Sequence, residues 1–348
     1  MNPYILALLL FALGLGTTLT FSSSHWLIAW MGLEINTLAI IPLMAQSHHP
    51  RAVEATTKYF LIQATAAAML LFASTTNAWF TGQWFIEQMV HPVPTTLITI
   101  ALALKIGLAP LHSWLPEVLQ GLDLVTGLIL STWQKLAPFA LLFQLHLETP
   151  TLLIILGVTS TLVGGWGGLN QTQLRKILAY SSIAHLGWMI LVIQFAPSLT
   201  LLTLLTYFIM TTFAFLTFKI NKAKSINLLA LASAKFPALT ILTPLVLLSL
   251  GGLPPLTGFM PKWLILQELT KQGLGMTATI AALTALLSLY FYVRITYAVA
   301  LTIAPNNVVA LAPWRLQTTQ FSLLLAITAI ASTALLPLTP TMLALLSA

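Results

Sequence analysis

The stretch TTLITIALALKIGLAPLHSWLP, residues 95–116, describes an apolar helix that is interrupted before its end. Its only charge ahead of the interruption is Lys105, and Gly107 and Pro110 follow within five residues. Proline lacks an N–H donor and clashes with the preceding helical turn. Irregular backbone is tolerated at membrane depth only where protein or water satisfies it. The stretch therefore predicts a broken membrane helix with a lysine beside the break.

A second stretch of the same kind is GGLPPLTGFMPK, residues 251–262, which ends on Lys262. The two breaks are five apolar segments apart, and this odd number would give them opposite orientations in a membrane. Broken helices in corresponding positions of inverted repeats mark ion paths in transporters. The bland interpretation is that proline and glycine are simply more frequent in membrane helices. We favour the repeat on topology, since sequence identity between the halves is weak.

Composition places the whole chain in a membrane. Its 348 residues are 58% hydrophobic and 6% charged, with a mean hydropathy of +0.94, whereas soluble domains have about 25% charged residues. Without cysteine the chain has no disulfide or thiolate metal site, and its seven acidic residues are too dispersed for a carboxylate metal site. The net charge of +7 could suggest nucleic acid, but no soluble segment is long enough to form a basic domain.

Apolar segments long enough to cross a bilayer, about 20 residues each, recur along the whole chain. We predict an all-α polytopic membrane protein of about eleven spans. It forms one domain, 1–348, with five-helix repeats in 1–147 and 148–301 and an additional C-terminal helix in 302–348. The expected spans are 3–21, 25–45, 56–79, 95–112, 123–146, 150–169, 174–194, 198–219, 237–269 (interrupted), 275–301 and 321–345.

Basic residues in the loops and at the helix ends predict the orientation. With these eleven spans, almost all of them face the side that holds the N-terminus, and only Lys271 faces the other. Positive charge concentrates on the cytoplasmic or matrix side of membrane proteins. We therefore expect the N-terminus on that side and the C-terminus opposite. The residues on the N-terminal side are Arg51, Lys58, Arg175, Lys176, Lys219, Lys222, Lys224, Lys235, Arg294 and Arg315.

Four ionisable residues, Glu34, Lys105, Lys135 and Lys262, lie near the middle of apolar segments. A charge at the bilayer centre costs roughly 2.5–3.5 kcal/mol on insertion scales, so such residues are candidates for an ion or proton pathway. Glu34 and Lys105 are the expected pair, because they have opposite charge and similar depth. A static ion pair is the competing interpretation. For Lys135 the competing interpretation is that the side chain extends to the membrane interface. For Lys262 it is that Glu268 lies close in sequence and compensates the charge.

Two histidines, His112 and His185, are secondary candidates, because histidine relays protons near neutral pH. A lone histidine in a helix is as often a satisfied core or interface residue, and both interpretations stay open. No phosphate-binding loop, dinucleotide fingerprint or haem-binding pair of histidines is present. We therefore expect no cofactor and no metal ion in this chain.

Several motifs resemble those of one family. The stretch KIGLAPLHSWLPE at 105–117 is similar to the signature of the antiporter-like subunits of respiratory complex I, which are relatives of Mrp antiporters. The start MNP at 1–3, WMGLEIN at 30–36, GGLPPLTGF at 251–259 and the total length resemble the vertebrate mitochondrial subunit 2 type of that family. The resemblance covers the whole chain.

The resemblance implies a fold of two inverted five-helix repeats that translocates protons without a cofactor. It assigns Glu34 and Lys105 as a coupled pair, Lys135 as the central lysine and Lys262 as the lysine near the exit, with His112 and His185 on the polar axis. NAD, FMN, iron–sulfur clusters and ubiquinone are expected in partner subunits, and quinone reduction there drives the pump. Other membrane-arm subunits and lipid are the expected partners, in the mitochondrial inner membrane with the N-terminus on the matrix side.

Two other functions stay open at this level. A stand-alone cation/proton antiporter would carry ions without partner subunits. A structural membrane scaffold would tolerate simultaneous apolar replacement of all four buried charges. Several charges at membrane depth argue against the scaffold, because each is costly to insert.

Overall fold

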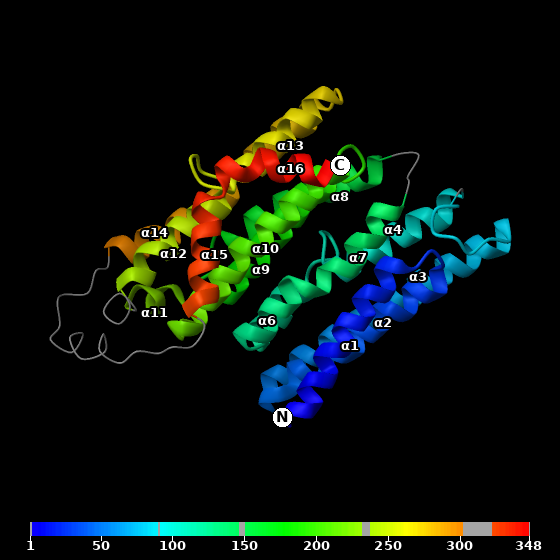
Figure 1. The fold of residues 1–348 in the computed structure, drawn as a ribbon, viewed down its shortest axis with the longest axis horizontal. Coiled ribbons are helices and arrows are strands. Elements are labelled where there is room, and N and C mark those ends of the chain that lie inside the picture. The colour runs from blue at the N-terminus through cyan, green and yellow to red at the C-terminus, as the bar shows by residue number, and fades with distance from the viewer. Residues whose placement is uncertain (1, 90, 146–149, 232–236, 302–321, 348) are drawn as a thin grey trace. The chain divides into compact units, whose positions relative to one another are not determined.

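The computed structural model describes residues 2–89, 91–145, 150–231, 237–301 and 322–347, and every regular element within these ranges is a helix. Extended pairing there is limited to two isolated bridges, His25 with Phe85 and Gln173 with Ser225. The predicted all-α class is thus confirmed. The chain divides into two compact units, residues 1–159 and 160–348, which we describe separately (Figure 1). The predicted single domain and repeat boundaries stay predictions.

Helices α1–α7 and the start of α8 make up the first unit. Side chains cap several of them: Asn2 accepts from the N–H of Tyr4, His25 from Leu27 and His49 from Arg51. The bounds are α1 Pro3–Ser22, α2 Trp26–Met44, the 3-10 turn η1 Ala45–Ser47, α3 Pro50–Thr81, α4 Pro92–Ile106, α5 Trp114–Gly121, α6 Leu124–Ser131, α7 Trp133–Gln144 and α8 Thr151–Gly168, which continues into the second unit.

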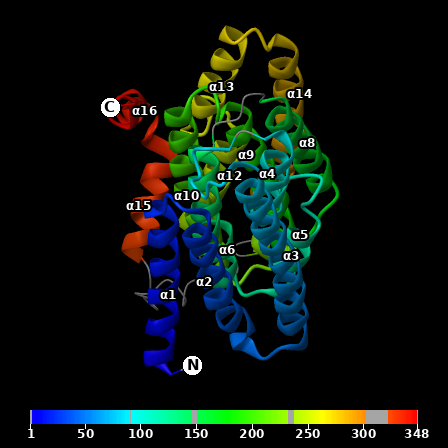
Figure 2. The ribbon, with the colours of Figure 1, turned by 90° about the vertical axis from the view of Figure 1, so that its right-hand side faces the viewer.

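Small residues let α1 and α2 pack closely, and the two helices run side by side in both views (Figures 1 and 2). A Cβ at Gly16 would lie 2.8 Å from the carbonyl oxygen of Gly32, and a Cβ at Gly32 would lie 2.8 Å from that of Gly16. Glycines at such a crossing let backbones approach in membrane helices. This contact fixes α2, which carries Glu34, against α1.

Helix α10 is the most buried candidate span and lies at the centre of the second unit, in contact with α9, α12, α13, α15 and α16. Figure 2 shows α15 along its side. The hydroxyl of Thr257 donates to the carbonyl of Ser332 in α15. The bounds are α9 Leu174–Val192, α10 Pro197–Ile220, α11 Ile226–Leu231, α12 Pro237–Gly251, α13 Phe259–Lys271, α14 Gly275–Leu301, α15 Ser322–Ala334, η5 Leu336–Leu338 and α16 Thr339–Ser347.

The described residues contain seven helices long and apolar enough to cross a membrane, or eight if one bent pair is a single span. This supports a polytopic membrane protein, while the count of eleven stays a prediction. Three predicted spans lie outside this set. One of them, 174–194, corresponds to α9 Leu174–Val192, which is not among the seven. The other two contain the predicted breaks. Shorter apolar helices over 92–106 and 238–251 stop at the Gly–Pro interruptions. The orientation of the two termini also stays a prediction.

The predicted C-terminal span, 321–345, begins outside the described residues, and its described part is bent. Its two helical parts, Leu323–Ala334 and Leu336–Leu346, meet at 71°. Pro337 lies directly after the bend, in η5, and removes a backbone donor there. The predicted span 123–146 also contains an irregularity, because Thr132 separates α6 from α7 with φ −115° and ψ −72°.

The two predicted breaks have the same local geometry in the same register. Gly107 and Gly252 adopt φ values of +87° and +83°, a left-handed conformation that glycine accepts without steric cost. Three residues later Pro110 and Pro255 each follow a cis peptide bond. Both breaks lead into helices that carry a proline near their start, Pro116 in α5 and Pro261 in α13. The two breaks thus match in register, while the repeat and its inversion both stay predictions.

Candidate functional site

The predicted pair forms in the first unit. Glu34 lies midway along α2 and Lys105 in the last turn of α4, with 3.7 Å between Oε1 and Nζ. The Lys105 side chain is 2% exposed and that of Glu34 is 23% exposed. The distance is too long for a hydrogen bond, and neither atom has another hydrogen-bond partner. The two groups therefore attract each other without being locked together.

The carboxylate of Glu34 has a second contact that holds it on its own helix. The hydroxyl of Thr37 lies 3.3 Å from Oε2 of Glu34 and also donates to the Glu34 backbone carbonyl at 2.9 Å. Lys105 and Thr37 thus contact different oxygens of the same carboxylate, Oε1 and Oε2. Such an arrangement lets the strength of the ion pair change with a small movement of either side chain.

The end of α4 explains why the Lys105 ammonium is available. The last carbonyls of a helix lack partners within it. Here the N–H of Leu108 donates to the Ala103 carbonyl at 2.9 Å, the Trp114 indole to Leu104 at 3.2 Å and the Gln63 amide to Lys105 at 3.3 Å. Neutral donors therefore satisfy these three carbonyls, and the ammonium of Lys105 lies near Glu34 instead.

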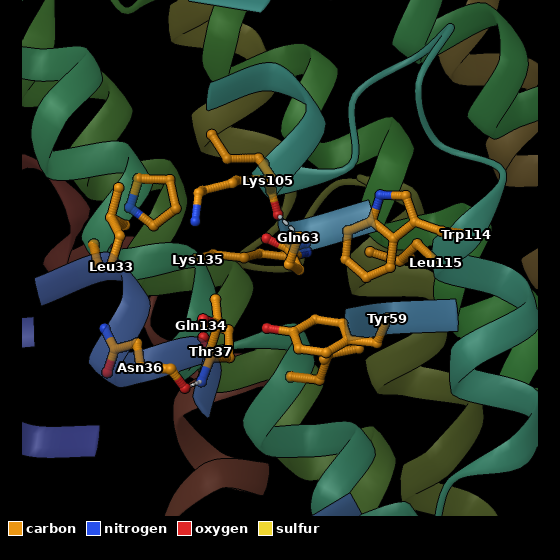
Figure 3. A pocket seen from close by; sticks show the side chains of 14 residues that line it. Leu33, Asn36, Thr37, Tyr59, Gln63, Lys105, Trp114, Leu115, Gln134 and Lys135 are labelled. Carbon is orange, nitrogen blue, oxygen red and sulfur yellow. Dashed lines mark hydrogen bonds between the residues drawn. The ribbon is translucent and has the colours of Figure 1, made fainter. Parts of the chain in front are cut away.

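Lys105 and Lys135 line one cavity, shown in Figure 3. Its volume is about 20 Å³, which is room for about one water molecule. Lys135 is 3% exposed, so its side chain is enclosed by the protein. The lining also includes apolar residues and five uncharged polar ones, namely Asn36, Thr37, Tyr59, Gln63 and Gln134.

These polar side chains were missed in reading the sequence. Asn36 is 2% exposed, and neither its Oδ1 nor its Nδ2 has a hydrogen-bond partner. A buried amide without partners is costly unless a water completes it. The Gln134 amide donates to the Asn36 backbone carbonyl at 3.2 Å, as drawn in Figure 3. The available signal was an uncharged polar residue within an apolar span, which is weaker than a charge.

Lys262 and His185 line a second cavity, also of about 20 Å³, in the second unit. Met189, Thr203, Thr206 and Met210 contribute to it. The His185 ring lies 5.4 Å from the Tyr207 ring. The ammonium of Lys262 donates to the carbonyls of Leu250 and Gly251, at 3.2 and 2.8 Å.

The acidic neighbour considered for Lys262 pairs with another residue. Glu268 lies 3.6 Å from Lys271 and accepts from Gln272 at 3.2 Å. The described structure thus brings Glu34, Lys105 and Lys135 together in one unit and Lys262 with His185 in the other. His112 lines neither cavity, and its Nδ1 lies 3.3 Å from the Pro110 carbonyl oxygen in the first break. The assignment of these residues to a proton path stays a prediction.

Comparison with known proteins decides the family. A family described as NADH:quinone oxidoreductase/Mrp antiporter, TM, matches residues 23–288. A second, NADH dehydrogenase subunit 2 C-terminus, matches residues 289–343. The chain belongs to the NADH dehydrogenase subunit 2 family. The predicted resemblance is confirmed.

Individual relatives of this subunit 2 family agree. NADH-ubiquinone oxidoreductase chain 2 of Tetraodon nigroviridis is 76% identical over 345 residues, which is 99% of both chains. A chain in respiratory complex I from Thermus thermophilus shares the fold with a TM-score of 0.81 and 29% identity, over 97% of this chain and 80% of that one. A chain of the Mrp complex from a Dietzia species, at 18% identity and a TM-score of 0.73 over 84% and 60%, shares the fold alone.

Proposed function

We propose that this member of the subunit 2 family is a proton-translocating membrane-arm subunit of NADH:ubiquinone oxidoreductase. The observation that carries the proposal is the buried Glu34–Lys105 pair, 3.7 Å apart, beside a cavity that also reaches Lys135. Family membership over the full length supports it. The chain itself transfers no electrons and serves as the non-redox, translocating part of the enzyme.

The pair acts as the input of the relay. While Glu34 is close, its negative charge stabilises the ammonium of Lys105 in a poorly hydrated site. A change elsewhere in the complex that draws the carboxylate toward Thr37 removes this compensation. Lys105 then gives up a proton, and Glu34 approaches again when the proton is replaced. The 3.7 Å separation and the hydrogen bond to Thr37 suit such a movement.

The cavity provides the next step. A proton can pass between two groups through one bridging water, and the cavity has room for about one. Lys105 gives a proton to this water, and the water gives another of its protons to the neutral amine of Lys135. Lys105 becomes neutral, Lys135 becomes charged and the water is unchanged. Tyr59 and Asn36 on the cavity wall orient the water.

Lys262 and His185 form the proton-transfer site of the second unit, which corresponds to Lys105 and Lys135 in the first. They share a cavity with Thr203 and Thr206, whose hydroxyls can bind water. His112, at the first break, is a secondary candidate beside the main path. We make no assignment of the order in which the two units exchange protons.

The surroundings of the chain follow from the same proposal. NAD, FMN, iron–sulfur clusters and ubiquinone belong to partner subunits, and this chain holds no cofactor or metal ion. Its partners are other membrane-arm subunits and lipid. The location is the mitochondrial inner membrane, multi-pass, with the N-terminus on the matrix side and the C-terminus on the intermembrane-space side.

The test compares two lysines that each pair with a glutamate. Lys105 is buried against Glu34, whereas Lys58 lies on the surface, 2.9 Å from Glu54 and 2.7 Å from Glu117. In the assembled complex, reconstituted in liposomes, Lys105→Met should lower the number of protons moved per NADH oxidised, and Lys58→Met should leave it unchanged. An unaltered proton stoichiometry in the assembled Lys105→Met complex would exclude a role for this pair.

The stand-alone antiporter is the second candidate. The family description, which includes Mrp antiporters, and the fold shared with the Mrp chain favour it. It predicts cation/proton exchange by the purified chain in liposomes, with no other subunit present. The structural scaffold predicts normal stoichiometry after simultaneous apolar replacement of Glu34, Lys105, Lys135 and Lys262. Exchange by the purified chain and the proton stoichiometry of the assembled complex, measured together, therefore separate all three functions.

A further inference from the structure

The two helix breaks share their backbone geometry but differ in what satisfies their free carbonyls. At the end of α12 the N–H of Leu253 donates to Leu248 at 3.3 Å and that of Gly252 to Ser249 at 2.9 Å. This is the pattern of a Schellman motif, which satisfies two of the last four carbonyls. The other two belong to Leu250 and Gly251, and both accept from the ammonium of Lys262.

At the first break, neutral side chains rather than a lysine donate to the free carbonyls at the end of α4. There, Trp114 and Gln63 supply neutral donors to the carbonyls of Leu104 and Lys105. Position for position, the residue after the proline of α5 is Glu117, which pairs with Lys58 on the surface, and the residue after the proline of α13 is Lys262. The second break is therefore completed by a positive charge, at the negative end of the α12 dipole.

Gly252 makes room for this arrangement. A Cβ at this position would lie 2.8 Å from Cδ and 3.0 Å from Nζ of Lys262. The corresponding Cβ at Gly107 would meet only Leu115 and Trp114, at 3.1 Å and beyond. The left-handed φ explains why each position is a glycine, but only at Gly252 does the absent side chain also admit a lysine.

We infer that Lys262 is the C-terminal cap of α12 and that Gly252 is the residue that positions it. This rests on the proposed function and deepens it: the helix break favours the protonated form of Lys262. Release of the proton removes the positive charge and one of three N–H donors, and the neutral amine that remains caps the two carbonyls more weakly. Ionisable groups on the helices packed around the site are His185 on α9, which shares its cavity, Tyr207 on α10, which contacts His185, and Tyr292 on α14, which lies beside Gly251. Proton transfer at Lys262 is thereby coupled to the conformation of residues 250–258.

Amide hydrogen exchange in the intact complex tests the cap independently of proton translocation. In Lys262→Met the amides of Gly252 and Leu253 should exchange about tenfold faster, the size expected for one lost buried hydrogen-bond partner. Lys262→Arg should restore slow exchange, because guanidinium can donate to both carbonyls, yet fail to restore transport, because arginine keeps its proton. The amides of Gly107 and Leu108 in the first break are the internal control and should not change.

A pair of glycine variants separates the cap from backbone strain. Gly252→Ala introduces strain and crowds Lys262, whereas Gly273→Ala introduces similar strain, at φ +75°, with open space around the new Cβ. Only Gly252→Ala should speed exchange at Leu253 and shift the pH profile of proton translocation. Equal behaviour of these two variants, or normal exchange in Lys262→Met, would overturn the inference. A loss of stoichiometry in Lys105→Met bears on the proposed function alone.

Discussion

The Nζ of Lys105 lies 3.7 Å from Oε1 of Glu34, and neither atom makes a hydrogen bond. Two buried opposite charges at this separation attract each other, but no directional bond holds them. By contrast, Lys58 and Glu117 on the surface meet at 2.7 Å. The closer contact is the exposed one, where ion pairs contribute little, and the looser contact is the buried one, where a change of distance has a larger electrostatic effect.

Removing one charge of the buried pair should cost more than removing both. Glu34→Gln leaves the ammonium of Lys105 uncompensated, and breaking a buried pair costs about 3–5 kcal/mol. The thermal stability of the assembled complex should therefore fall in Glu34→Gln and recover in the double variant Glu34→Gln with Lys105→Met. Proton stoichiometry should stay low in both. Recovery of pumping in the double variant would mean that the pair is structural.

Filling the cavity should slow proton transfer while every charge stays in place. Ala137 lines the cavity and is 1% exposed, so Ala137→Leu would occupy the space for water at an overpacking cost of about 1–3 kcal/mol. Ala140→Leu on the same helix, outside the cavity lining, is the matched control. The measurement is the rate of proton release after a pulse of NADH. Equal rates in the two variants would show that no water in this cavity takes part.

Asn36 tests whether the cavity is hydrated. Its side chain is buried without a hydrogen-bond partner, so Asn36→Leu should stabilise the protein if the amide is unsatisfied and slow proton transfer if the amide holds a water. We expect slower transfer with little change in stability. Asn77→Leu is the control, because Asn77 is equally buried but does not line the cavity. A stabilised Asn36→Leu complex that pumps normally would contradict this.

The contact between α1 and α2 should be disrupted by a larger side chain at Gly16 and should tolerate one at Gly14. A Cβ at Gly16 would meet the Asn36 side chain and the Gly32 backbone within 3 Å, whereas Gly14 has open space around it. Gly16→Leu should therefore lower the thermal stability of the complex by an overpacking cost of about 1–3 kcal/mol, and Gly14→Leu should not. Equal stabilities would show that the two helices separate readily.

The charges at membrane depth and the two helix breaks could be read from single residues. Lys105, Lys135 and Glu34 are conspicuous because each is charged within an apolar segment, and Gly107 with Pro110 marks a break because these residue types restrict the backbone locally. The all-helical membrane class follows in the same way from the length of apolar runs. These features depend on residues close in sequence, which is why the sequence alone was sufficient for them.

Partners across helices depended on the tertiary structure. That Gln63 and Trp114 satisfy the end of α4, while Lys262 satisfies the end of α12, requires contacts that no local pattern encodes. The cavity lined by Asn36 and Tyr59 was overlooked because uncharged polar residues are common in membrane helices. The sequence determined which residues are costly to bury, because that cost belongs to each side chain. Only the tertiary structure decided which neighbouring residue offsets this cost, because that residue comes from a helix distant in sequence.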